Sequence, residues 1–311
     1  MAIIRGGDAE YESNKPSLDE KKEKFKKIIS ELAANKQDHM EFAGRYIGLE
    51  EVTAIAGLEI VKDFKGLTLS DNQIDNESLK ILLESPYLKN LERLDLGINF
   101  LTDSGIKDWA QLNEVRWEKL KTLFLNDNRL GDEAISAFLM SPHAASLEIL
   151  NLDYTQVGNG VCNSFAETAQ LTNLKEFHLD RGYVDDEGIK KLLEWEGLEE
   201  LKVLKLTSNK LTDDGVEELS KSTRLRSIKN LDLGYNQITD KGCKALADSN
   251  MIESLDTLTV SRNPFTEEGA KGLKELKNSG RLKNLILYEG VDNTPDLVNY
   301  SKPELLRPDG G

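Results

Sequence analysis

Three histidines, His39, His143 and His178, are the side chains of this 311-residue chain best suited to acid–base chemistry or to binding a transition metal. They are scattered, and no cysteine or carboxylate stands at a spacing that would complete a metal site around them. The sequence also contains no G-x-x-x-x-G-K-[ST] loop, no nucleophile elbow and no H-E-x-x-H motif. We therefore expect a non-catalytic protein, with no catalytic residue, no metal and no cofactor.

Tyrosine and arginine side chains recur at a different kind of position, two residues after short L-x-L sequences. Both residue types are enriched where proteins bind one another. They indicate recognition of another protein. The full set at this position is Asp71, Ile98, Asp127, Tyr154, Arg181, Ser208, Tyr235, Arg262 and Glu289.

These positions belong to a repeated pattern, L-x-x-L-x-L-x-x-N-x-L, whose copies begin 27 residues apart, with one spacing of 29. Nine copies at so regular a spacing do not arise by chance. Their first positions are Phe64, Leu91, Leu120, Leu147, Leu174, Leu201, Ile228, Leu255 and Leu282.

Each copy combines two periodicities that must position the candidate side chains. The L-x-L alternation, as in Leu94 and Leu96, predicts a strand with one buried face. The second half of each copy has helical spacing, as in Ile106 and Trp109, which can cover that face. In several repeats the predicted helix is preceded by a residue suited to cap its first free amides. These residues are Thr102, Asp185, Thr212, Thr239 and Thr266. Acidic pairs in the first helical turn, such as Asp132 with Glu133, suit the helix dipole.

Copies such as LERLDLGINFLTDSGI from Leu91 and IKNLDLGYNQITDKGC from Ile228 resemble leucine-rich repeats over residues 64–290. Their length and the T-D-x-G turn are most similar to the ribonuclease-inhibitor and Ran GTPase-activating-protein branch. The resemblance implies an α/β leucine-rich-repeat solenoid, a curved horseshoe with a parallel β-sheet on the concave face and helices on the convex face.

Residues at two further positions of the repeat are predicted to stabilise the fold. Cys162 and Cys243 share a buried helix position three repeats apart; at about 4.8 Å per strand this is roughly 14 Å, beyond disulfide reach. The resemblance also implies a ladder of asparagine side chains that satisfy backbone groups between turns. Its members are Asn72, Asn99, Asn128, Asn209, Asn236 and Asn263.

The ends of the chain depart from the repeat. Residues 1–36 are expected to form an N-terminal tail and a capping helix that opens at a Ser17–Glu20 capping box, with a partner-binding helix as the alternative. Residues 37–63 match the repeat through Met40, Phe42 and Ile47 and predict a degenerate capping repeat. Nine repeats then fill 64–290. Residues 291–311 carry three prolines and are expected to form a C-terminal cap and tail, with 291–300 over the last strand.

The concave face is the predicted partner-binding surface, because nine strands at about 4.8 Å make a sheet roughly 40 Å long. The alternative is that these side chains only decorate a sheet that favours aromatic residues. Thr155 and Gly182 interrupt the asparagine ladder, so we expect Tyr154, His178, Asp180 and Arg181 at the centre of the contact. The predicted surface comprises Arg93, Phe124, Asp127, Asp153, Tyr154, His178, Asp180, Arg181, Lys205, Tyr235, Arg262 and Tyr288.

The composition limits the kind of partner. A formal net charge of −15 opposes binding to nucleic acid. No apolar run approaches the ~20 residues of a membrane span, and the N-terminus does not resemble a secretory signal. We expect a cytoplasmic, monomeric protein that recognises or scaffolds a protein partner, with a bacterial effector translocated into a host cell as a variant. GTPase activation toward a small GTPase is the alternative function that the resemblance implies.

Overall fold

Short strands recur once in every repeat, wherever a buried residue lies between two that face away from the core. The computed structural model describes residues 16–287, and these contain ten strands in one parallel sheet whose spatial order follows the sequence. The degenerate repeat therefore adds a tenth strand to the nine expected. The strands are β1 (His39–Glu41), β2 (Gly66–Thr68), β3 (Arg93–Asp95), β4 (Thr122–Phe124), β5 (Ile149–Asn151), β6 (Glu176–His178), β7 (Val203–Lys205), β8 (Asn230–Asp232), β9 (Thr257–Thr259) and β10 (Asn284–Ile286).

Helices alternate with the strands and form the second layer. The α-helices are α1 (Leu18–Ala34), α2 (Leu49–Ala56), α3 (Asn76–Glu84), α4 (Asp103–Ala110), α5 (Asp132–Met140), α6 (Asn159–Glu167), α7 (Asp186–Leu192), α8 (Asp213–Lys221), α9 (Asp240–Ala247) and α10 (Glu267–Asn278). Short 3₁₀ helices lead into four strands: η1 (Glu59–Asp63), η2 (Pro142–Ala144), η3 (Glu196–Glu200) and η4 (Asn250–Glu253).

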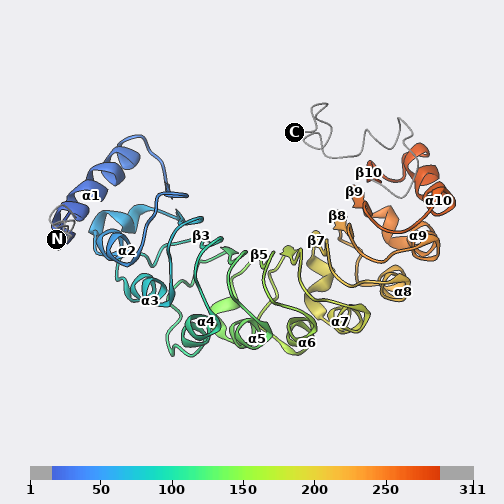
Figure 1. Cartoon of the computed structure of the whole chain (residues 1–311), viewed down its shortest axis with the longest axis horizontal. Coiled ribbons are helices and arrows are strands. Elements are labelled where there is room, and N and C mark those ends of the chain that lie inside the picture. Colours follow the sequence, from blue (N-terminus) through green and yellow to red (C-terminus); the bar gives the residue numbers. More distant parts are fainter. Residues whose placement is uncertain (1–15, 288–311) are drawn as a thin grey trace, which may run out of the picture.

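The two layers form one arc. Figure 1 shows the strands along its inner side and α2 to α10 along its outer side. Strand register is constant: the central leucine of β3, Leu94, pairs with Leu67 on one side and Leu123 on the other. Leu94, Ile106 and Trp109 are all buried, so strand and helix of one repeat share a core. The predicted solenoid, with its parallel sheet and covering helices, is confirmed.

The predicted helix caps are confirmed with one exception. Asp185, Thr212, Thr239 and Thr266 each accept a hydrogen bond from a backbone amide in the first turn of the following helix. Thr102 precedes α4 but makes no such bond, so that prediction was wrong. Its hydroxyl instead accepts a 2.7 Å hydrogen bond from Asn76 Nδ2 of the preceding repeat.

The asparagine side chains connect successive turns. Asn99 Nδ2 donates to the carbonyls of Leu69, Leu96 and Gly97 at 2.9–3.1 Å, and its Oδ1 accepts the amide of Ile74 at 3.0 Å. Because the side chain is buried, these bonds replace the water that the backbone groups have lost. Asparagines 72, 128, 209, 236 and 263 bridge neighbouring repeats in the same way.

Helix α1 covers the N-terminal end of the stack. It begins with the predicted capping box, in which Ser17 and Glu20 exchange hydrogen bonds. Phe25 and Ile29 are buried, and the Phe25 ring meets the Phe42 ring edge-on at 5.6 Å. The apolar face of α1 is thus occupied by the first repeat, which supports a covering role and leaves that face closed to a partner.

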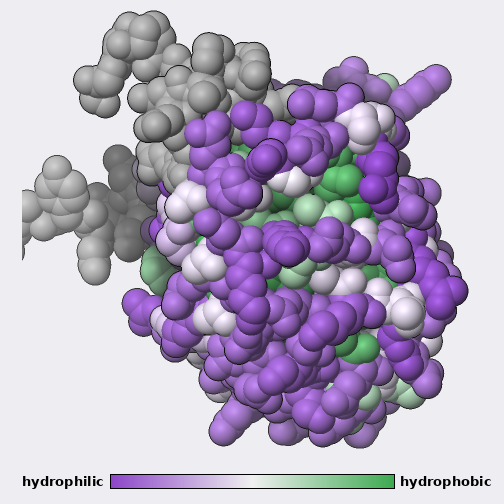
Figure 2. Space-filling view, turned by 90° about the vertical axis from the view of Figure 1, so that its right-hand side faces the viewer, coloured by the Kyte–Doolittle hydropathy of each residue, from purple (hydrophilic) through white to green (hydrophobic). Residues whose placement is uncertain are grey.

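The C-terminal end of the described arc is formed by α10 and β10. Figure 2 shows this end covered mostly by hydrophilic side chains, with hydrophobic ones gathered in a hollow between them. The segment 291–300, expected over the last strand, lies outside the described residues.

Replacing Asn99 with alanine should destabilise the fold by about 2–4 kcal/mol, because several buried backbone groups lose their partner. Urea unfolding measures this loss. Asn230→Ala, an exposed asparagine of β8, is the control and should change stability by less than about 0.5 kcal/mol. Equal losses in the two variants would show that the ladder does not stabilise the fold.

Candidate protein interface

The inner face of the sheet is built from the strand residues that flank each buried leucine. In β3 to β10 the middle residue is buried while its two neighbours are half-buried or exposed. Helices cover the opposite face, so these neighbours face the hollow of the arc (Figure 1). We call the predicted site residues in and directly after the strands the floor. They are Arg93, Phe124, Asp153, His178, Asp180 and Lys205.

The other predicted site residues lie along the edge where the strands end. We call the residues two and four positions after the second apolar residue of each L-x-L the rim. Five rim residues were predicted as contacts: Asp127, Tyr154, Arg181, Tyr235 and Arg262. Floor and rim form two adjacent rows along the arc. Tyr288, also predicted, lies outside the described residues.

The first rim position has a backbone conformation that the sequence analysis missed. Tyr154 and Arg181 both have φ of 57°, in the left-handed region, and Tyr235 has 52°. Such a conformation costs a non-glycine residue roughly 1–2 kcal/mol. Asp71 and Ser208 share it, as does the same position after each strand from β2 to β9, so it belongs to the repeated turn and does not mark a site by itself.

Two floor carboxylates also hold the backbone of the next repeat. Asp153 Oδ1 accepts the amide of Asp180 at 2.7 Å, and Asp180 Oδ1 accepts the amide of Thr207 at 2.8 Å. Burial raises the pKa of Asp180 to about 6, with a further contribution from Asp153; burial likewise raises the pKa of Asp153. Both side chains therefore serve the scaffold and contribute only part of their surface to the hollow.

His178 is less accessible than the sequence suggested. Its side chain is only 12% exposed, and burial, with a smaller effect of Lys205, lowers its pKa to about 4. The imidazole is neutral at pH 7, so its 3.7 Å approach to Glu176 is not an ion pair. His178 can add little to a polar contact.

Cationic side chains stack on the aromatic rings of the inner face. The Arg181 guanidinium carbon lies 4.7 Å from the centre of the Tyr154 ring, and Arg262 lies 5.6 Å from Tyr235. On the floor, Arg93 lies 4.8 Å from the half-buried Phe124 ring. Each stack joins neighbouring repeats and restricts side chains that would otherwise be mobile, which lowers the entropy lost on binding.

Two exposed aromatic residues escaped the sequence analysis. Phe100 is 54% exposed and Tyr183 is 53% exposed, and both occupy the second rim position. Lys210 Nζ lies 5.1 Å from the Tyr183 ring. Aligning the repeats by their 27-residue period would have revealed this position. Its residues in successive repeats are Gln73, Phe100, Arg129, Gln156, Tyr183, Lys210 and Gln237.

A cleft of about 410 Å³ opens among the rim residues that follow β3 to β6. Phe100, Tyr154 and Tyr183 supply aromatic walls, while Arg129 and Arg181 supply positive charge. We call this hollow the rim cleft. Its volume suits a few side chains of a bound segment.

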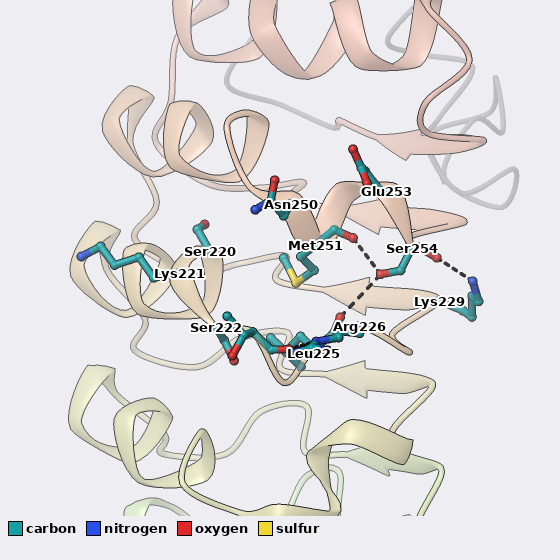
Figure 3. A pocket seen from close by; sticks show the side chains of 11 residues that line it. Ser220, Lys221, Ser222, Leu225, Arg226, Lys229, Asn250, Met251, Glu253 and Ser254 are labelled. Carbon is teal, nitrogen blue, oxygen red and sulfur yellow. Dashed lines mark hydrogen bonds between the residues drawn. The ribbon is translucent and has the colours of Figure 1, made fainter.

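A second hollow, of about 550 Å³, lies at the opposite edge of the sheet, between the connection into β8 and η4 (Figure 3). Several of its polar groups are used within the scaffold. Lys229 Nζ donates to the Ser254 carbonyl at 2.9 Å, and Ser254 Oγ donates to the Met251 carbonyl at 2.8 Å. These bonds join successive connections and leave few groups for a ligand.

Other kinds of site find no support in residues 16–287. They contain no group of three or more histidine, cysteine, aspartate or glutamate side chains arranged to hold a metal ion. No helix among them is long and apolar enough to cross a membrane. Cys162 and Cys243 are buried and unbridged, as predicted.

The raised pKa of Asp180 predicts a pH-dependent stability. Between pH 3.8, the ordinary pKa of an aspartate, and about pH 6, the folded state binds a proton on Asp180 more tightly than the unfolded state does. The stabilising effect of this group is therefore lost as pH rises through that range. Asp180→Asn keeps the acceptor for Thr207 and should gain about 1–2 kcal/mol over the wild type between pH 4 and pH 7.

Urea unfolding at several pH values measures this difference. Asp127→Asn removes the same charge from an exposed rim position and controls for net charge. A difference between Asp180→Asn and the wild type that stays constant from pH 4 to pH 7 would contradict the assignment.

Comparison with known proteins supports the repeat. A family model described as Leucine Rich repeat matches residues 118–139, 200–220 and 224–247. No curated protein matches the chain. Among solved structures, the Arabidopsis receptor kinase HAESA with a peptide hormone and a co-receptor is 18% identical, with a TM-score of 0.43 over 75% of this chain. This chain covers 39% of that protein.

An internalin from Listeria monocytogenes is 19% identical, with a TM-score of 0.40 over 88% of this chain and 87% of its own. The repeat matches, the single parallel sheet and the covering helices agree with one another. Three segments of the chain match leucine-rich repeats, and the described residues fold as an α/β leucine-rich-repeat solenoid.

Proposed function

We propose that this protein is a non-catalytic recognition or scaffold module that binds a protein partner along its floor and rim. One observation carries the proposal. Of the nine exposed large hydrophobic residues in the described part of the chain, five lie on the rim: Ile98, Phe100, Tyr154, Tyr183 and Tyr235, each 46–54% exposed. Exposed hydrophobic side chains that gather along one edge are typical of a binding site, whereas single scattered ones are not.

The repeat architecture supports this function physically. Stacked repeats present their inner side chains as one extended surface, which solenoid proteins use for binding. Each described repeat has a full helix and most copies keep the 27-residue period, which favours the ribonuclease-inhibitor-like type. GTPase activation has only the family resemblance as support, and a GTP-hydrolysis assay with added protein separates it from recognition. A cytoplasmic location and an effector role stay predictions.

Substitutions on the inner face should abolish partner capture, while matched convex substitutions should not. Arg93→Glu with Lys205→Glu reverses two floor charges, and Tyr154→Ala removes a rim anchor. Lys190→Glu with Lys244→Glu reverses the same number of charges on α7 and α9. Residues at the centre of an interface typically contribute about 2 kcal/mol or more, so captured partner should fall by at least about tenfold in the inner-face variants.

Quantitative mass spectrometry of proteins captured from native lysate measures the effect, after circular dichroism has shown that each variant is folded. Equal loss from inner and convex variants would refute binding on the inner face.

A further inference from the structure

The rim cleft joins aromatic walls to arginines that lack an acidic partner. Arg129 and Arg181 are exposed, and within residues 16–287 neither makes an ion pair. Several surface lysines elsewhere are paired with a carboxylate; Lys107 lies 2.7 Å from Glu133, for example. In a chain of net charge −15, two such guanidinium groups in one cleft form a local concentration of positive charge.

The geometry of Arg181 suits a carboxylate. Its guanidinium stacks on the Tyr154 ring at 4.7 Å, which occupies one face and holds the plane in position. The N–H groups along the edge of a stacked guanidinium remain available to a ligand, and two of them match the two oxygens of a carboxylate. Phe100 and Tyr183 line the same cleft, and their exposed rings offer apolar surface to the hydrophobic part of a bound segment.

The charge distribution favours an acidic peptide over a nucleic acid. A polyanion would extend beyond the cleft and meet the net negative charge of the chain. A single carboxylate side chain feels mainly the charges within about 8–10 Å, and among the residues that line the cleft the two arginines, Arg129 and Arg181, outnumber the one carboxylate, Asp127.

From these observations we propose that the rim cleft binds an acidic segment of the partner protein, whose aspartate or glutamate side chains contact Arg129 and Arg181 between aromatic walls. This assignment rests on the proposed function, because it names the chemistry of a partner held on the inner face.

Selection of short random peptides displayed on phage tests the assignment directly. The displayed peptides are linked to the coat protein and have no free C-terminal carboxylate, so acidic enrichment reports side chains. Peptides selected on the wild-type chain should be enriched in aspartate and glutamate, and this enrichment should vanish on Arg129→Gln with Arg181→Gln. Lys244→Gln with Lys271→Gln removes the same charge from exposed convex positions and should keep the enrichment.

A synthetic copy of the most enriched peptide, measured by fluorescence anisotropy, should bind the double arginine variant at least about tenfold more weakly than the wild type. Replacing its acidic residues with their amides should have the same effect on the wild type.

Other outcomes separate this inference from the proposed function. Peptides that lose binding to Phe124→Ala or Tyr235→Ala but bind the double arginine variant normally would overturn the acidic-segment assignment and leave inner-face recognition standing. Selection of basic peptides, or acidic enrichment that persists without the two arginines, would also overturn the assignment. Peptides that bind all inner-face variants as well as the wild type would refute both proposals.

Discussion

Buried backbone groups in the turn after each strand depend on hydrogen bonds that cross to the neighbouring repeat, and this constraint governs the stacking of the described repeats. Asn99 bonds three carbonyls and one amide of two repeats at once. Because an unpaired buried backbone group is costly, the bonds fix how one turn lies on the next. Gly182 has no side chain to take part, and Thr155 instead donates its hydroxyl to the Leu152 carbonyl at 2.6 Å. The ladder is thus interrupted beside the rim cleft, where the exposed aromatic residues gather.

Because the repeats stack in a fixed register, residues one period apart in the sequence lie side by side on the surface. Since Leu67, Leu94 and Leu123 stay in register, side chains one period apart meet across neighbouring strands. The Tyr154–Arg181 and Tyr235–Arg262 stacks both arise in this way. Such contacts order the side chains before any partner arrives, so less entropy is lost on binding.

The fold could be predicted from the sequence because buried residues recur at regular spacings. Strand alternation identifies Leu94 as buried, and helical spacing identifies Ile106 and Trp109. The inner face was predictable only in outline. His178 proved largely buried, because exposure within a strand depends on the side chains of neighbouring repeats. Phe100 and Tyr183 were overlooked because they lie two residues beyond the left-handed position, where the alternation of the strand no longer indicates which side chains are exposed. The hydrogen bonds that Asp153 and Asp180 accept from backbone amides of the next repeat likewise depend on three-dimensional stacking.

The central claim is that the rim lies on the inner side of one continuous arc. Spin labels at Asp127→Cys and Arg262→Cys, five repeats apart on the rim, should be separated by about 24 Å if strands stack at about 4.8 Å. Labels at Glu133→Cys and Glu268→Cys, on the helices of the same two repeats, should lie roughly 40–50 Å apart. Cys162 and Cys243 are buried, and burial raises the pKa of each thiol to about 12, so neither should take the label. Double electron–electron resonance measures both distances; an inner separation about half the outer one supports the account, whereas equal separations, or a longer inner one, would contradict it.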